Sequence, residues 1–161
     1  MQAAIIACHA QAEKAEATDW PRIAALYAHL AAVVPSSIVE LNRAVAVGMA
    51  EGPEPGLKIA DPLLHEPALK AYHLPPSVRG DLLYKLGRYA EARDAFETAA
   101  ALAGNRREHD LLRRRAAEGG QCGEVIMITC ALPLSGLWHV HNCEQRIDRM
   151  SRSVLIPFQL C

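Results

Sequence analysis

The residues that could best bind a metal or act in catalysis lie near the C-terminus, where cysteine and histidine are concentrated. Four of the five cysteines come after residue 120. Structural zinc sites usually contain two cysteines separated by only about two to four residues, and the sequence has no such pair. We therefore predict no metal site and no cofactor, and a small metal-binding or enzymatic protein is the alternative interpretation. The candidate ligands, spaced Cys-x7-Cys-x8-His-x-His-x-Cys, are Cys122, Cys130, His139, His141 and Cys143.

The histidines do not form a catalytic pattern. The sequence contains no GxSxG nucleophile motif, no phosphate-binding loop and no GxGxxG dinucleotide motif, and these are the short motifs that would indicate acyl or phosphoryl chemistry or a nucleotide cofactor. We predict that the chain is not an enzyme. The seven histidines are scattered over the whole length, at His9, His29, His65, His73, His109, His139 and His141.

Composition excludes several other classes of protein. The 161 residues carry a formal net charge of −1, which gives no electrostatic indication of a nucleic-acid binder. The longest mainly apolar run, 125–134, is shorter than the roughly 20 residues that a membrane helix needs. The first residues lack the basic start of a signal peptide, and an odd number of cysteines without CxxC favours free thiols. These features predict a cytoplasmic protein without a membrane span.

The clearest structural pattern is the stretch 80–102. It reads as one helix, a tight turn at Gly87, and a second helix that returns antiparallel. Small residues stand where two helices would approach closely, and large residues stand where the space between them must be filled, which is typical of a tetratricopeptide repeat (TPR) hairpin. The positions that define this packing along the chain are Trp20, Tyr27, Gly80, Leu83, Gly87, Tyr89, Ala92, Phe96 and Ala99.

Turn signals recur at the period of such repeats. Gly52 follows Thr18 by 34 residues, and Gly87 follows Gly52 by 35, close to the TPR period of about 34. We predict an all-α fold in which about two and a half antiparallel helical hairpins stack as a TPR-like, right-handed solenoid over residues 1–119. Residues 120–161 form a second, unassigned segment, an irregular tail that is disordered, a weak strand or hairpin, or a cap over the last helix.

Proline, glycine and capping residues set the expected helix ends. Pro35 and the Gly52-Pro53 pair each end a helix, Pro62 stops a short one, and Gly119-Gly120 ends the last. The composition of 125–129 favours a β-strand. The expected helices cover 2–16, 21–34, 38–50, 54–60, 75–86, 89–104 and 106–118.

Several phrases of the sequence, in order, resemble the C-terminal extension of a group of bacterial extracytoplasmic-function (ECF) RNA polymerase sigma factors. The resemblance covers residues 2–118. It implies a TPR-like regulatory module that modulates transcription initiation through protein contacts, with RNA polymerase, the parent sigma domains or a regulatory protein as partner. The matching phrases are 3–10, 18–27, 35–47, 72–76, 79–83 and 86–88.

The chain also departs from that family. No segment corresponds to the promoter-reading sigma domains, and residues 121–161 match nothing in the family pattern. We therefore expect a fragment that does not bind DNA directly. The helix expected at 2–16 has no preceding partner, so its apolar face predicts self-association.

Two sets of polar residues are candidate binding groups. The first helix of each TPR hairpin lines the concave groove, where polar side chains can hold a partner peptide. We assign Asn42, Arg43, Arg79 and Lys85 to this groove, with local pairing of Arg43 with Glu40 as the alternative. The basic run at 113–115, with Arg106 and Arg107, is interleaved with acidic residues, and we interpret it as a solvated end face.

Overall fold

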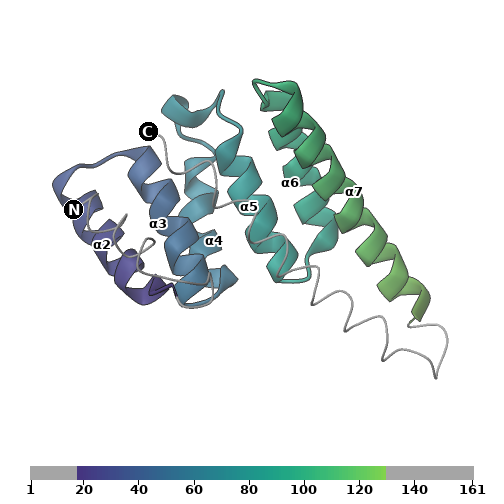
Figure 1. Cartoon of the computed structure of the whole chain (residues 1–161), viewed down its shortest axis with the longest axis horizontal. Helices are drawn as coiled ribbons and strands as arrows, with labels where there is room; N and C mark the ends of the chain where they lie inside the picture. Colours follow the sequence, from purple (N-terminus) through teal and green to yellow (C-terminus); the bar gives the residue numbers. More distant parts are fainter. Residues whose placement is uncertain (1–17, 130–161) are drawn as a thin grey trace. The chain divides into compact units, whose positions relative to one another are not determined.

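The structure, a computed structural model, describes residues 18–129, with side chains described as far as Gly119. The chain divides into two units, Met1–Gly120 and Gln121–Cys161, and the packing below belongs to the first. The described residues form six α-helices and one 3-10 helix, without a strand (Figure 1). These elements are α2 (Trp20–Val33), α3 (Ser37–Ala50), α4 (Pro53–Leu63), η2 (Pro67–Leu69), α5 (Leu74–Lys85), α6 (Tyr89–Leu102) and α7 (Arg106–Thr129).

The helices pack in chain order as a row of hairpins. From α2 to α6 each helix packs against the next one in the sequence, and α3 also touches α5. Figure 1 shows α3 paired with α4 and α5 paired with α6, so that α3 and α5 are the first helices of two successive hairpins. Because each helix packs mainly on its neighbours in the chain and on the equivalent helix of the next hairpin, the architecture is that of a repeat protein. The predicted all-α, TPR-like solenoid is confirmed.

The helix boundaries follow from local chemistry at the turns. The Asp19 carboxylate accepts a hydrogen bond of 3.0 Å from the backbone N–H of Arg22, which caps the start of α2. Gly52 and Gly87 connect the helices of the two hairpins with φ values of 110° and 74°. This left-handed backbone is strained for residues with a Cβ, so the two predicted turns depend on glycine.

The second helix of the first hairpin is longer than the sequence suggested. We expected 54–60 with a stop before Pro62, but α4 begins at Pro53 and ends at Leu63. Pro62 lies in the last turn, where it removes only one intrahelical hydrogen bond, and buried Leu57, Ala60 and Leu63 hold the helix against its neighbours. The prediction that Pro62 stops this helix is therefore wrong.

The last helix is also longer than the sequence suggested. We expected it to end at Gly119-Gly120 and expected β-structure at 125–129, but α7 continues to Thr129. Extending a formed helix adds one backbone hydrogen bond per residue, whereas glycine costs only about 1 kcal/mol and β-branched residues less. A strand would need a partner, and the described residues contain none. Both expectations are wrong.

The α5–α6 hairpin is held by one buried aromatic ring. Phe96, Leu83, Ala92 and Ala99 are each 0% exposed. An ideal Cβ built on Gly80 would lie 2.8 Å from the Phe96 ring, closer than real contacts allow. The missing side chain of Gly80 therefore lets the ring lie flush against α5.

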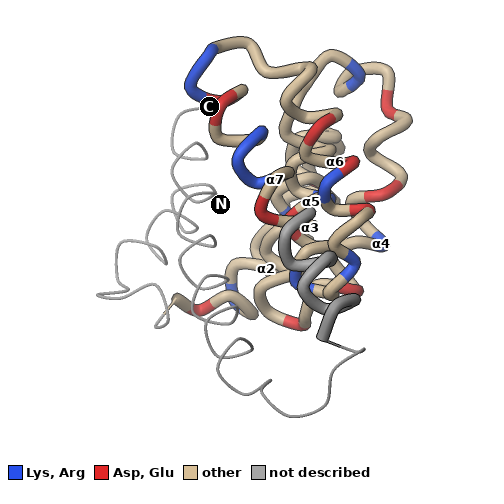
Figure 2. Tube along the Cα trace, turned by 90° about the vertical axis from the view of Figure 1, so that its right-hand side faces the viewer, with Lys and Arg blue, Asp and Glu red and all other residues tan. Residues whose placement is uncertain are grey.

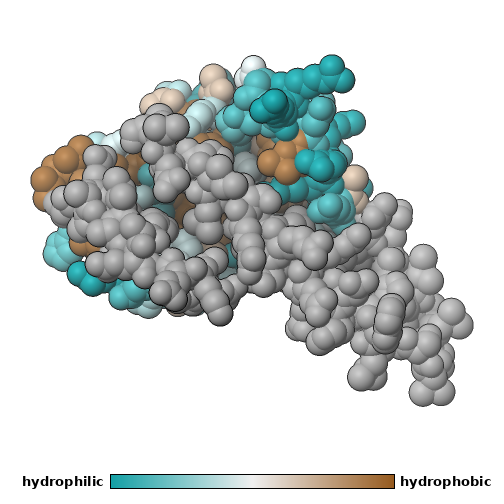
Figure 3. All heavy atoms as spheres, viewed as in Figure 1, coloured by the Kyte–Doolittle hydropathy of each residue, from teal (hydrophilic) through white to brown (hydrophobic). Residues whose placement is uncertain are grey.

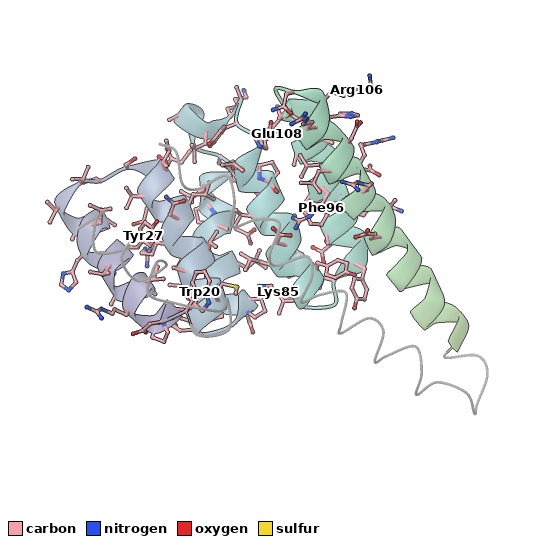
Figure 4. The ribbon with its side chains drawn as sticks, viewed as in Figure 1. Trp20, Tyr27, Lys85, Phe96, Arg106 and Glu108 are labelled. Atoms are coloured by element: carbon pink, nitrogen blue, oxygen red, sulfur yellow. The ribbon has the colours of Figure 1, made fainter. Side chains whose placement is uncertain are left out.

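Trp20 and Tyr27 belong to a different cluster, at the α2–α3 interface. They pack around buried residues of both helices, among them Ile23, Leu30 and Val47, and Figure 4 shows both aromatic side chains at this end of the solenoid. Burial raises the pKa of the Tyr27 hydroxyl. Tyr89 is only half-buried and meets the ring of Tyr84 edge to face, with the centroids 5.1 Å apart.

Gly80→Ala is expected to lower the free energy of unfolding by about 1–2 kcal/mol. Overpacking a core typically costs about 1–3 kcal/mol, and the better helix propensity of alanine offsets part of this. Gly104→Ala is the matched control, because nothing lies within 4 Å of a Cβ at that position. Urea unfolding of the two variants measures the difference, and equal stabilities would contradict the close packing of Gly80 on Phe96.

Two expectations concern residues outside the described range. The helix at 2–16, with its predicted self-association, precedes residue 18, and most of the tail 120–161 follows Thr129. Within the described residues, no helix combines the length and apolar character needed to cross a bilayer.

Candidate functional site

A buried ion pair joins the first helices of two successive repeats. Arg115 Nη1 on α7 donates a hydrogen bond of 2.7 Å to Asp81 Oδ1 on α5. The Arg115 side chain is 5% exposed and the Asp81 side chain 20%. A charged pair in such a setting holds two helices in register, because neither group can lose its partner without leaving a buried charge.

The aromatic core of the hairpin supports this pair. The guanidinium carbon of Arg115 lies 5.5 Å from the centroid of the Phe96 ring, within the range of a cation–π interaction. Phe96, labelled in Figure 4, thus contacts Gly80 on one helix and Arg115 on another. The ion pair and the packing of α5, α6 and α7 form one unit.

Lys85 extends the charged cluster towards α3. It lies one helical turn after Asp81, and its Nζ is 2.9 Å from Met49 Sδ on α3. Burial lowers the pKa of Lys85, opposed by the nearby Asp81 carboxylate. Burial also raises the pKa of the Asp81 carboxyl, opposed by Arg115 and, more weakly, by Lys85. We call Asp81, Lys85 and Arg115 the Asp81 cluster.

The Asp81 cluster retains hydrogen-bonding capacity. Asp81 Oδ2 is buried and accepts no hydrogen bond. The Lys85 ammonium has three donors, and among the described residues it donates to the thioether sulfur of Met49, which is a weak acceptor. Asp81 Oδ2 has no exposed surface, so an incoming segment would meet the lysine and not this oxygen. A backbone carbonyl or a carboxylate would be a stronger acceptor for Lys85 than sulfur. The arrangement can therefore bind a polypeptide, whereas it offers no nucleophile with an adjacent base.

The two predicted groove residues on α3 are placed differently. Arg43 donates to Glu40 Oε2 through Nε at 2.9 Å and Nη2 at 2.7 Å, so the local pairing considered as an alternative is formed. Asn42 Oδ1 is buried without a hydrogen-bond partner. Among the described residues, Lys85 bonds to Met49 and not to Asn42 or Arg43, and the role of Asn42 and Arg43 in partner binding stays a prediction.

Arg79 lies on the α4–α6 side of α5. Its Nε donates to Asp61 Oδ1 at 2.9 Å, and its Nη2 lies 4.0 Å from Glu91 Oε2. Lys85 contacts α3 instead. Six residues along a helix correspond to a rotation of about 240°, so the structure does not bring these two predicted groove residues together.

The cysteine and histidine ligand set cannot be placed. Cys130, His139, His141 and Cys143 lie outside the described residues, and the side chain of Cys122 does so too. In the described part, no three His, Cys, Asp or Glu side chains are grouped so that they could hold a metal ion.

Asp81 and Arg115 are functional candidates that the sequence interpretation missed. Arg115 stands in a run of three arginines that reads as solvated surface. The spacing of the two residues could have indicated the pair, because they are 34 positions apart, which is one repeat period. Opposite charges at equivalent positions of successive repeats predict contact between stacked helices.

Comparison with known proteins agrees with the observed hairpin. A tetratricopeptide repeat family model matches residues 77–106, which run from the first turns of α5 to the first residue of α7. The chain contains a tetratricopeptide repeat. The predicted repeat is confirmed, and it includes Asp81, Lys85 and Phe96. Such repeats generally provide surfaces for protein partners.

A curated relative is similar over a larger part of the chain. The protein named "Uncharacterized protein R00370" of Rhizobium meliloti (strain 1021) is 49% identical over 113 residues. This segment is 70% of the present chain but only 26% of the relative, so the chain spans about a quarter of that protein. No solved structure matches the chain.

Proposed function

We propose that this protein is a peptide-binding interaction module whose binding face is formed by α3, α5 and α7. The observation that carries the proposal is Lys85, a half-buried lysine whose ammonium donates only to the weak thioether acceptor Met49 Sδ among the described residues. A backbone carbonyl or a carboxylate is a stronger acceptor than a thioether sulfur. A partner segment that offers one to Lys85 would gain a charge-assisted hydrogen bond on binding.

The module acts in transcription, as the regulatory extension of an ECF-type sigma factor. The sequence phrases that resemble that family support this role. The repeat match at residues 77–106 supports its coarser part, contact with a protein partner. The partner is RNA polymerase, the sigma domains or a regulatory protein, and the contact is with protein rather than promoter DNA.

Lys85→Gln is expected to weaken partner binding about tenfold, because it removes a charge-assisted hydrogen bond worth roughly 1.5–3 kcal/mol. Titrating the full chain into bacterial core RNA polymerase, and separately into purified ECF sigma domains, measures the dissociation constants. Lys58→Gln is the matched control, because Lys58 is an exposed lysine on α4. It should change binding by less than about twofold.

The outcomes separate the two parts of the proposal. Binding to polymerase or sigma domains that depends on Lys85 supports both the binding face and the sigma role. Binding that is equally sensitive to Lys58 and Lys85 contradicts the face. Absence of binding to either preparation contradicts the sigma role.

A further inference from the structure

The basic run near the start of α7 is divided by the fold into two kinds of arginine. Arg115 is buried against Asp81. Arg106, Arg107, Arg113 and Arg114 are exposed, and Arg106 is 94% exposed and projects outward in Figure 4. Because residues i and i+7 lie on one helix face, these four arginines share one side of α7 across about two turns.

The described arginines fall into two groups. Half of the ten lie 3.5 Å or less from a carboxylate oxygen, namely Arg43, Arg79, Arg88, Arg93 and Arg115. Arg107, Arg113 and Arg114 make no ion pair with a described residue. Two carboxylates lie on the same face: Asp110, which pairs with Arg106 and His109, and Glu118, one turn after Arg114. The face keeps a net positive charge that the fold does not use.

We propose that this face, defined as Arg106, Arg107, Arg113 and Arg114 and called the α7 arginine face, docks an acidic helical segment of a partner protein. Arg107 and Arg114 are seven residues apart, about 10.5 Å along the axis. That spacing matches carboxylates two turns apart on a second helix laid beside α7. Arginine is suited to this contact because its planar fork binds carboxylates through two hydrogen bonds.

The surroundings favour an acidic protein over nucleic acid. Figure 2 shows basic segments alternating with acidic ones along α7, and Figure 3 shows hydrophilic atoms gathered at this end of the solenoid. Asp110 in the middle of the face would repel a continuous row of phosphates. No Phe, Tyr or Trp on which bases could stack occurs between Arg106 and Ala117. An acidic helix can place its carboxylates so that they avoid Asp110.

The test uses the full chain and a labelled synthetic peptide of about 20 residues, long enough to form helix. Its glutamates stand at i, i+4 and i+7. A scrambled peptide of the same composition and a DNA duplex of similar charge are the other probes. Arg107→Glu/Arg114→Glu should weaken binding of the patterned peptide about tenfold or more, and Arg107→Ala/Arg114→Ala about threefold. Fluorescence anisotropy at low and high salt reports the affinities.

Arg22→Glu is the matched control, because Arg22 is an exposed arginine on α2 whose side chain makes no ion pair with a described residue. It should leave binding within about twofold of the original chain. Equal loss in Arg22→Glu, equal binding of the scrambled peptide, or tighter binding of the DNA duplex would overturn the proposal.

Discussion

Arg115→Ala is expected to lower the free energy of unfolding by about 3–5 kcal/mol at neutral pH. Removing one partner of a buried ion pair leaves the other as an uncompensated charge, and here the stranded group is the Asp81 carboxylate, 20% exposed. The variant also loses the contact with the Phe96 ring. Urea unfolding of the full chain, followed by circular dichroism, measures the change.

The neighbouring arginine provides the control. Arg114→Ala removes the same side chain from an exposed position one residue earlier, and it should change stability by no more than about 0.5 kcal/mol. The double replacement Asp81→Leu/Arg115→Met should recover most of the lost stability, because apolar pairs often replace buried ion pairs without loss. If Arg115→Ala cost no more than Arg114→Ala, the pair would have no structural role.

The cost of Arg115→Ala should shrink as the pH falls. Burial already raises the pKa of Asp81, and Arg115 opposes that effect. Without Arg115 the folded-state pKa lies further above the unfolded value. For a raised carboxyl pKa, the extra stability is present below the unfolded pKa and is lost as the pH rises through the folded pKa. Unfolding curves of the variant between neutral and acid pH should therefore converge on those of the original chain.

The sequence predicted the α5–α6 hairpin well because that hairpin is locally determined. Gly87 requires a left-handed backbone, and Gly80 leaves room for Phe96, so the turn and the packing are both visible in residue types. The lengths of α4 and α7 were missed because the cost of a proline or glycine in a helix is only a few kcal/mol. Tertiary packing and helix propagation outweigh it, and a local pattern does not contain them.

The candidate site was only partly predictable for a related reason. Lys85 was chosen because it is a polar residue on a first helix, and the structure gives it a weak sulfur acceptor. Arg79 was chosen by the same rule, yet it pairs with Asp61 on the other side of the helix. Residue type does not reveal which charges the fold pairs. The exception is Asp81 with Arg115, where the repeat period itself predicts the contact.

Phe96→Ala is expected to lower the free energy of unfolding by about 3–5 kcal/mol, the range for truncating a fully buried aromatic residue. The ring is 0% exposed and fills the space above Gly80. Its loss leaves a cavity and removes the surface on which the Arg115 guanidinium lies. Phe96→Leu keeps most of the volume and should cost about 1.5 kcal/mol or less. Urea unfolding of both variants tests this order.

In the Phe96→Ala variant, the effect of Gly80→Ala on the free energy of unfolding should change sign. In the original chain a Cβ at this position meets ring atoms of Phe96 at 2.8–3.0 Å, so Gly80→Ala destabilises. In the Phe96→Ala background those atoms are gone, and alanine keeps its advantage in helix propensity of about 1 kcal/mol over glycine. Gly80→Ala should then stabilise. A double-mutant cycle measures the coupling, and additive effects would show that Gly80 and Phe96 do not pack directly on each other.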